Sequence, residues 1–385
     1  MTPPVVDLVT VALRELIVAF GHGSPRVAAY SPGRCTIVGE HVDYAGGLVL
    51  GAAIDLGVAV AIRASPDRLY RAVSAGRQVK RVDPSPVGDI GDRIFAAATA
   101  LREHGIDVPV FEAAVAATLP EGAGLASSAA VTCATLLALA RLTGAKLSPN
   151  GFATTAFRAE HDLVGVPCGF LDQRMIVDAP HDGLLLLDCR DATSTPQPWP
   201  FKDVVLCLCS TDQRHDVGGS GYRIRRQQVE AALARVGVDS CQDLTATAMD
   251  AARLAPMDAR RMRHVSGETA LTALAVRTLR NGDARMLGSL MSESHRSLRD
   301  NFEVSTPLLD RVVAAAETVP GCLGARLVGA GFGGSVLALT YVNAAESCRE
   351  TMATAAHVGV QSTWTLAPAP GLALQAADVI NLRDA

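Results

Sequence analysis

The sequence has 385 residues, 49% of them hydrophobic and 19% charged, so the chain can bury a large apolar core and is not a disordered protein. A chain of this length suits two domains. The formal net charge of −4 provides no general basic field, which argues against a nucleic-acid partner.

The cysteines and the apolar runs bear on the cellular compartment. Nine cysteines are scattered without a Cys-x-x-Cys pair, which is typical of reduced thiols in a cytosolic protein. The N-terminus has no basic segment followed by an apolar one, so no secretory signal is expected. Apolar runs fall short of the roughly 18 residues of a membrane span. We therefore expect a cytoplasmic protein with no membrane contact.

Hydrophobic patterning predicts a first half built from both helices and strands. Apolar residues at helical spacing predict a helix over 5–20, and a second helix is expected over 90–103. Runs bounded by turn residues predict strands over 27–30, 35–38, 48–50, 58–63, 69–74, 78–82 and 110–118. The strands on either side of Ala75-Gly76 are expected to form a hairpin.

A long helix is predicted from Ser127 or Ser128 to about Leu142, before Gly144, a usual helix-terminating residue. Its apolar residues lie nearly all round, so we expect it at the centre of a domain.

The next helix is expected to begin at Ser148 and Pro149, a capping serine followed by proline at the first helical position. An apolar strand is predicted over 183–188.

The proline-rich segment 193–200 interrupts this pattern. We expect the boundary between two domains here, dividing the chain into 1–196 and 197–385. The second domain is predicted to contain a strand over 204–209, a helix over 222–236, several helices over 244–291, and strands over 324–328 and 336–341 joined by a glycine-rich turn.

The segment 31–47, SPGRCTIVGEHVDYAGG, places Arg34, Glu40, His41 and Asp43 beside a strand-like core. In a half-buried strand these groups need hydrogen-bond partners. A polyhydroxylated ligand can provide them, because carboxylates accept hydrogen bonds and an imidazole both donates and accepts. A salt-bridged hairpin, with Arg34 paired to Glu40 or Asp43, is the alternative that the residues alone leave open.

The segment 122–128, GAGLASS, is a second candidate site at the start of the long helix. Glycines let a backbone approach a phosphate, and the free N–H groups of a first helical turn favour anions. The segment is not a Walker A loop, because no lysine follows a glycine in this chain, and a dinucleotide fingerprint would need a third glycine. An ordinary loop with a serine cap is the other reading of these residues.

Two segments together resemble a known family. GRCTIVGEHVDY, residues 33–44, resembles the galactokinase signature, with departures at Thr36 and Ala45, where that family usually has Asn. LPEGAGLASSAA, residues 119–130, resembles the second motif of the GHMP small-molecule kinases, the superfamily of the galactokinases. Here Ala126 stands in place of the usual Ser.

Three further segments extend the resemblance. GARLVGAGFGGS, residues 324–335, is similar to the third motif of the superfamily, whose glycines are expected to shape the pocket. CGFLDQ, residues 168–173, resembles the family's Cys-Gly-Ile-Met-Asp-Gln. The segment 210–226 is similar to a family segment that ends Ser-Glu-Tyr-x-x-Arg-Arg, with departures at Asp212 and Gly221.

The resemblance implies roles at the reacting end of the site. Asp172 would take the proton of the attacking sugar hydroxyl, and Arg34 would pair with Asp172 and balance charge on the transferred phosphoryl group. A structural Arg–Asp pair is the alternative. The residues implied to bind the sugar are Glu40, His41, Val42, Asp43, Gly169 and Tyr222.

The resemblance also implies ATP as the co-substrate and Mg²⁺ as its metal, with Ser128 and Glu160 as metal ligands. Without the resemblance, the sequence would predict Glu160 to be a surface charge on a helix and Tyr222 to be an aromatic side chain packed in the core. The residues implied to bind ATP are Ser74, Gly122, Ala123, Gly124, Leu125, Ala126, Ser127 and Ser128.

The fold implied by the resemblance is the two-domain α+β architecture of the GHMP kinases. An N-terminal α/β domain and a C-terminal ferredoxin-like domain would have the active site between them. The implied reaction is phosphorylation of D-galactose by ATP at the anomeric hydroxyl, giving α-D-galactose 1-phosphate and ADP.

Two alternatives stay open. The departures at Thr36, Ala45, Asp212 and Gly221 suggest a kinase for a related sugar, such as an amino sugar or arabinose. Ala126 suggests a catalytically weak sensor of galactose and ATP. A mevalonate- or homoserine-type kinase fits worse, because carboxylates in the pocket would repel an anionic substrate. We expect a monomer, with an oligomer as the open alternative.

Overall fold

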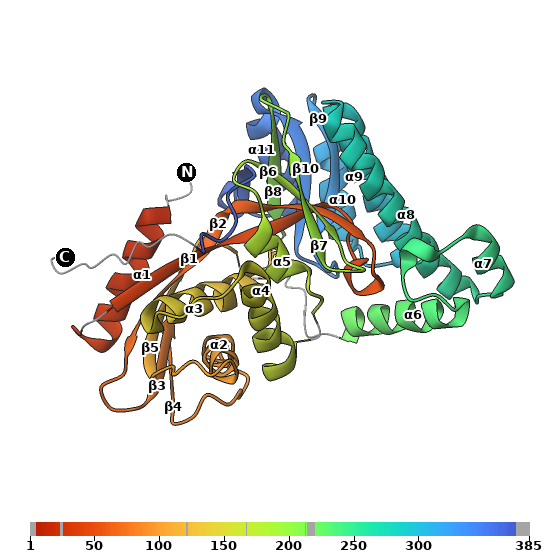
Figure 1. Ribbon diagram of the computed structural model, residues 1–385. Helices are drawn as coiled ribbons and strands as arrows, with labels where there is room; N and C mark the ends of the chain where they lie inside the picture. Colours follow the sequence, from red (N-terminus) through yellow and green to blue (C-terminus); the bar gives the residue numbers. More distant parts are fainter. Residues whose placement is uncertain are drawn as a thin grey trace.

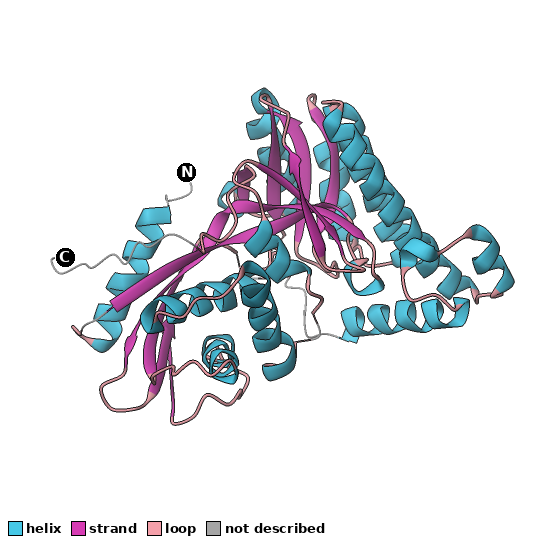
Figure 2. Cartoon of the chain, in the orientation of Figure 1, coloured by secondary structure: helices cyan, strands magenta, loops and turns pink. Residues whose placement is uncertain are grey.

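A computed structural model describes residues 5–23, 26–120, 122–166, 168–211, 213 and 220–374. In this part of the chain the strands form two sheets, with seven and four strands, and helices cover both (Figures 1 and 2). The α+β expectation from the sequence is confirmed.

The larger sheet has the order β4-β3-β5-β2-β6-β7, with β1 paired to β2. Its strands are β1 (Arg26–Val38), β2 (Leu48–Ala64), β3 (Tyr70–Ser74), β4 (Arg77–Arg81), β5 (Phe111–Ala117), β6 (Gly183–Asp188) and β7 (Thr193–Pro198). The strands β3 and β4 form the predicted hairpin.

The strand β1 corrects the prediction of two short strands over 27–30 and 35–38. It runs antiparallel to β2 without a break, because the register shifts at Pro32/Gly33 and at Thr36/Val38 absorb the irregular residues as bulges. The strand β2 likewise joins the two predicted strands 48–50 and 58–63. The polar segment around Arg34 is therefore held in a sheet rather than in a loop.

Alternating residues of β2 explain why this sheet is covered on both faces. Ala59 and Ala61 pack with α1 (Val5–Phe20), while Val58, Val60 and Ile62 pack in the core on the opposite face. That core contains α3 (Ser127–Thr143), which lies between the sheet and two further helices, α2 (Asp92–Glu103) and α4 (Pro149–Arg158). The central position predicted for α3 is confirmed.

The segment 193–200 was expected to interrupt the fold, and that expectation is wrong over 193–198. These residues form β7, which pairs antiparallel with β6 at the edge of the larger sheet. Prolines lack a donor N–H, which an edge strand can spare on its open side. The predicted domain boundary between 196 and 197 falls inside this strand and stays a prediction.

The smaller sheet is antiparallel, with the order β11-β8-β10-β9. Its strands are β8 (Val204–Ser210), β9 (Cys322–Val328), β10 (Ser335–Tyr341) and β11 (Thr363–Leu366). The side chains of β8 alternate between two cores, with Cys207 and Cys209 beside helices and Leu206 and Leu208 in the core shared with the larger sheet. The shared core joins the two sheets.

The remaining helices pack against the two sheets or against one another (Figure 1). They are α5 (Leu171–Asp178), α6 (Ser220–Val236), α7 (Ala246–Ala251), α8 (Pro256–Arg280), α9 (Ala284–Ser297), α10 (Pro307–Glu317) and α11 (Ala345–Ala356). Among the residues described, no helix combines the length and apolarity that crossing a membrane requires. All nine cysteines lie in the described part of the chain, and six of them are buried.

Candidate active site at the junction of the two sheets

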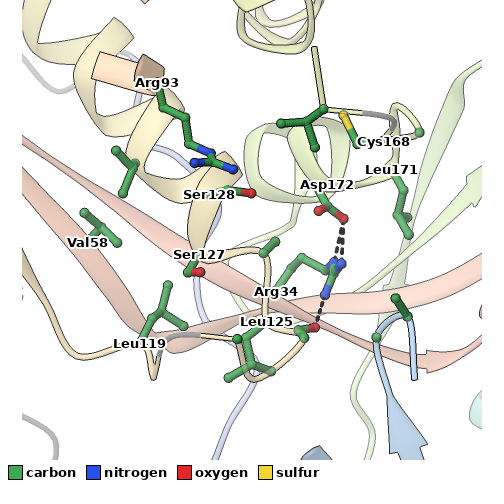
Figure 3. A pocket seen from close by; sticks show the side chains of 18 of the residues that line it. Arg34, Val58, Arg93, Leu119, Leu125, Ser127, Ser128, Cys168, Leu171 and Asp172 are labelled. Carbon is green, nitrogen blue, oxygen red and sulfur yellow. Dashed lines mark hydrogen bonds and ion pairs between the residues drawn. The ribbon is translucent and has the colours of Figure 1, made fainter. Parts of the chain in front are cut away.

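The predicted motifs converge on one cavity of about 380 Å³. Figure 3 shows it between the start of α3, the strand β1 and the helix α5. The predicted site residues that line it are Arg34, Glu40, His41, Asp43, Ser74, Gly122, Gly124, Leu125, Ala126, Ser127, Ser128, Gly169, Asp172 and Tyr222. Three other predicted residues, Val42, Ala123 and Glu160, are buried in or behind the cavity wall.

The closest charged pair in the cavity joins Arg34 of β1 to Asp172 in the first turn of α5. Nε and Nη2 of Arg34 lie 2.8 and 2.6 Å from Oδ1 of Asp172, and Nη1 donates to the Gly124 carbonyl at 2.5 Å. Burial lowers the pKa of the guanidinium, but the carboxylates of Asp172 and Glu40 outweigh it and raise that pKa. The pairing of Arg34 with Glu40 or Asp43 that a hairpin would have made is therefore wrong.

Asp43 is the second carboxylate exposed to the cavity. It lies in a single 3₁₀ turn, Asp43–Ala45, after β1. Burial, followed by the nearby charges of Asp172 and Glu40, raises the pKa of Asp43 to about 6. Gly169 lies against this carboxylate so closely that a Cβ on the glycine would be 1.7 Å from Oδ2 of Asp43. A side chain at position 169 is thus incompatible with the present place of Asp43.

Glu40 is fixed by groups from the smaller sheet. Its Oε1 accepts a hydrogen bond from the Gly329 N–H at 2.7 Å and lies 3.5 Å from Nη2 of Arg326, which is on β9. Burial raises the pKa of Glu40, and the charges of Arg326 and Arg34 oppose that effect. The carboxylate thus reaches the cavity while the other sheet positions it.

His41 is held in an uncommon backbone conformation, with φ of 61°. Its Nε2 is 3.0 Å from the Ala330 carbonyl and its Nδ1 is 2.9 Å from the Tyr44 hydroxyl. Because a carbonyl only accepts, Nε2 carries the proton and Nδ1 accepts from Tyr44. Burial lowers the pKa of His41 to about 3, so the ring is neutral. Tyr222 of α6 packs against it, with ring centroids 5.6 Å apart.

The glycine-rich loop is shaped by three left-handed residues before α3. Gly122, Gly124 and Ala126 have φ of 72°, 75° and 59°. Ala126 caps α3 without a side-chain hydrogen bond, so the first-turn N–H groups have no capping side chain. Gly124 packs on Gly329 of the third motif, where a Cβ on Gly329 would be 2.7 Å from Cα of Gly124. The two glycine motifs therefore shape one wall together.

Glu160 is buried, which corrects the reading of this residue as a surface charge. It lies in a π-helical turn, Ala159–Leu163, that continues α4, and its side chain is 2% exposed. Its Oε2 accepts from Nε2 of Gln173 at 2.8 Å, and its Oε1 lies 3.5 Å from Nε of Arg93. Burial raises the pKa of Glu160, while the Ser128 hydroxyl and Arg93 oppose that rise.

Several residues at or near the cavity were not predicted from the sequence. Arg93, on α2, lines the cavity, but a single charge in a helix gave no signal for it. Arg326 lay within the third motif and was not singled out. Buried Glu268, on α8, accepts from the Gly39 N–H at 2.9 Å and from the Ser294 hydroxyl at 2.5 Å. The apolar part of the lining includes Val58, Ile90, Ile94, Val115, Leu119 and Val131.

Two predicted features fall partly outside the described residues. Asp212, a departure from the family pattern, and Glu121, within the glycine-rich loop, are not among the residues that the structure describes.

Comparison with protein families gives three matches in chain order. The model of the galactokinase galactose-binding signature matches residues 17–64, that of the GHMP kinases N terminal domain matches 92–178, and that of the GHMP kinases C terminal domain matches 275–357.

Curated proteins and solved structures agree with these matches. Galactokinase from Homo sapiens is 34% identical over 89% of this chain and 91% of its own, and galactokinase from Roseiflexus is 34% identical over 89% and 90%. The structure of Lactococcus lactis galactokinase complexed with galactose has a TM-score of 0.87 and 25% identity, covering 95% of this chain and 99% of that one.

The mevalonate kinase of Methanococcus jannaschii shares the fold, with a TM-score of 0.69 and 16% identity over 90% of this chain and 99% of that one. The GHMP kinase fold predicted from the sequence is confirmed. Because the chain is similar to curated galactokinases over most of its length and matches three models of this family and its superfamily, it belongs to the galactokinase family of the GHMP kinases.

Proposed function

We propose that this chain transfers the γ-phosphoryl group of ATP to the anomeric hydroxyl of D-galactose, giving α-D-galactose 1-phosphate and ADP. Family membership supports ATP-dependent phosphorylation of galactose. The observation that carries the proposal is the Arg34–Asp172 pair, which lies in the same cavity as the glycine-rich loop and the acidic sugar motif.

In this proposal Asp172 takes the proton of the anomeric hydroxyl as that oxygen attacks the γ-phosphorus. The new bond joins the sugar oxygen to phosphorus, and the bond from phosphorus to the β–γ bridging oxygen breaks, leaving ADP. Arg34 keeps Asp172 ionised and balances charge on the transferred group, which matters because phosphoryl transfer depends mainly on positioning and electrostatics.

We assign the sugar to the end of the cavity that holds Glu40, Asp43 and Tyr222. Two carboxylates and a phenol offer acceptors and a donor to adjacent hydroxyls. His41 has both ring nitrogens engaged by Tyr44 and Ala330, so its proposed role is to hold the sugar motif in place.

Of the other predicted sugar residues, Gly169 provides room for Asp43, and buried Val42 supports the same turn.

We assign ATP to the other end. Its phosphates would lie on the loop of Gly122, Ala123, Gly124, Leu125 and Ala126 and on the α3 N-terminus with Ser127 and Ser128, where N–H groups and the helix dipole favour anions. The apolar side chains around Ser74 suit the adenine ring, because β3 and β5 pair there and offer a flat apolar surface.

The donor set at Ser128 and Glu160 fits Mg²⁺ in its chemistry. A hydroxyl and a carboxylate are hard oxygen ligands, and Mg²⁺ usually takes few protein ligands beside substrate phosphates and water. No cluster of three or more acidic, histidine or cysteine ligands occurs among the described residues. When bound, the metal would neutralise charge on the ATP phosphates; Ser128 and Glu160 would hold it.

The domain division 1–196 and 197–385, a monomeric state and a cytoplasmic location complete the proposal. The division rests on the two sheets, since β8 begins the smaller one at Val204. The proposed function involves no contact with nucleic acid or with a membrane.

A related sugar is the second candidate, because three departures from the family pattern, Thr36, Ala45 and Gly221, lie within four positions of predicted sugar residues in the chain. Thr36 is fully buried with a hydroxyl that lacks a hydrogen-bond partner, and Gly221 lies against the Phe332 ring. The sensor alternative rests on Ala126 alone, while Arg34 and Asp172 are in place for transfer.

The test is ADP release by the purified protein with Mg-ATP and a panel of galactose, glucose, N-acetylgalactosamine, arabinose and mevalonate. We expect turnover with galactose well above the rest. Preference for another sugar would replace galactose in the proposal. Galactose binding without turnover would support the sensor instead.

A further inference from the structure

Arg93 is a cation on the wall of the cavity that the roles assigned so far do not use. It is the second residue of α2, its side chain is 34% exposed, and it lines the cavity. Figure 3 shows its guanidinium directed toward Ser128, at the start of α3. Among the side chains that line the cavity, Arg34 is the other arginine.

The two arginines differ in how far their donors are engaged. Arg34 is held by Asp172 and by the Gly124 carbonyl at hydrogen-bond distance. Nε of Arg93 makes no hydrogen bond, and within the described chain its ion-pair contact is the 3.5 Å approach to Oε1 of Glu160. That distance exceeds an ordinary N–H···O hydrogen bond. Arg93 therefore keeps its donors available for a stronger acceptor.

Glu160 does not depend on Arg93 alone. Gln173 donates to it at 2.8 Å, and the Ser128 hydroxyl also lowers the pKa of this carboxyl. An arginine with a flexible stem can turn from a loosely held carboxylate to a group of higher charge without leaving that carboxylate bare. A nucleotide tail on the α3 N-terminus, beside Ser128, would be such a group.

We propose that Arg93 binds the β-phosphate of the nucleotide, turning from Glu160 to the phosphate oxygens. The planar guanidinium matches phosphate in a two-pronged geometry that a lysine cannot reproduce. Arg93 is then a substrate-binding residue at the phosphate end, separate from Arg34, which stays with Asp172. The inference rests on the proposed use of ATP.

The experiment measures nucleotide binding in the absence of metal, so that it does not depend on turnover. ADP and adenosine are titrated by calorimetry in buffer containing EDTA, with the unmodified chain, Arg93→Met and Arg93→Lys. Arg14→Met is the matched control, because Arg14 is an exposed residue of α1 on the opposite face of the larger sheet. Galactose titration and thermal unfolding check that each variant is folded.

We expect Arg93→Met to weaken ADP binding about tenfold, equivalent to about 1.4 kcal/mol, and to leave adenosine binding unchanged. Arg93→Lys should recover part of the loss, and raising the salt concentration should reduce the difference between variants. Arg14→Met should match the unmodified chain.

Unchanged ADP affinity in Arg93→Met would overturn the role of Arg93. So would an equal loss for adenosine and ADP, which would indicate a packing effect. Failure of the unmodified chain to bind ADP would overturn the proposed function together with this inference, so the two failures are distinguishable.

Discussion

The contact between Gly169 and Asp43 gives the sharpest test of the sugar end. In Gly169→Ala, the new Cβ would be 1.7 Å from Oδ2 and 2.8 Å from Cγ of Asp43, far inside any real contact distance. The atoms that clash belong to the end of a short side chain, so the carboxylate would rotate away from the cavity wall. The variant should therefore fold and lose the present position of Asp43.

The expected loss of galactose affinity follows from the free energy of one hydrogen bond that the Asp43 carboxylate would accept from the sugar. A hydrogen bond to a charged group contributes about 1.5–3 kcal/mol, so losing one should weaken galactose binding by roughly 10- to 100-fold. Affinity for ADP should stay within about twofold, because the three atoms nearest to a Cβ at position 169 all belong to Asp43 and none to the glycine-rich loop. Calorimetric titration of galactose and of ADP measures both on the same sample.

Gly267→Ala is the matched control for this substitution. Gly267 lies within α8, and a Cβ there would have nothing within 4 Å. Alanine in a helix interior is favoured over glycine by about 0.5–1 kcal/mol, so this variant should be slightly more stable with unchanged galactose affinity. Galactose affinity within about twofold of the unmodified chain in Gly169→Ala would refute the reasoning, as would an equal loss of ADP affinity.

Three further variants address the carboxylates. Asp172→Asn should lower kcat by about 10²- to 10⁴-fold while calorimetry still detects galactose binding, and near-normal turnover would remove the proton-accepting role. Burial raises the pKa of Asp43 from 3.8 to about 6, so between these two pH values the folded state binds more protons than the unfolded state. The contribution of protonated Asp43 to the free energy of unfolding is therefore present below pH 3.8 and is lost as the pH rises through 6. Asp43→Asn should thus be more stable above pH 6, by at most about 3 kcal/mol in urea unfolding, yet lose galactose affinity; equal stability at pH 8 would contradict the burial argument. Glu268→Ala should lower the free energy of unfolding by about 3–5 kcal/mol, because it leaves Arg326 and the Gly39 N–H without this buried partner, and a loss below about 1 kcal/mol would show that the network adds little.

Local structure followed from the sequence wherever one periodicity or one cap decided it. The helix over 5–20 has the predicted bounds, and the Ser148 hydroxyl caps α4 by accepting from the Gly151 N–H at 3.1 Å. The long strand β1 was divided in the prediction, because Pro32 and Gly33 usually end a strand. Pairing with β2 holds them in the ladder as a bulge, and this pairing is a tertiary effect that local pattern does not contain.

The candidate site was predictable only where a motif kept its residues together. Arg34 and Asp172 are 138 positions apart, and the residues alone suggested pairing with nearer carboxylates; the family resemblance connected the two. Glu160 and Arg93 are single charges on helices, a pattern typical of solvent-exposed faces. The π-helical turn rotates Glu160 inward, and the packing of α2 beside α3 brings Arg93 to it. Neither the inward direction of Glu160 nor the place of Arg93 beside it can be predicted from a local sequence pattern.

The sugar motif is a product of both sheets, although its residues are contiguous on β1 and the turn after it. Glu40 is held by Gly329 and Arg326, which come from the end of β9, and the backbone N–H of Gly39 is held by Glu268 of α8. These groups are buried, so each would be left without a partner if the two sheets separated, at a cost of about 1–3 kcal/mol apiece. Binding of the sugar and packing of the sheets therefore depend on the same hydrogen bonds, and substitutions in α8 or β9 should change galactose affinity without touching the ligand.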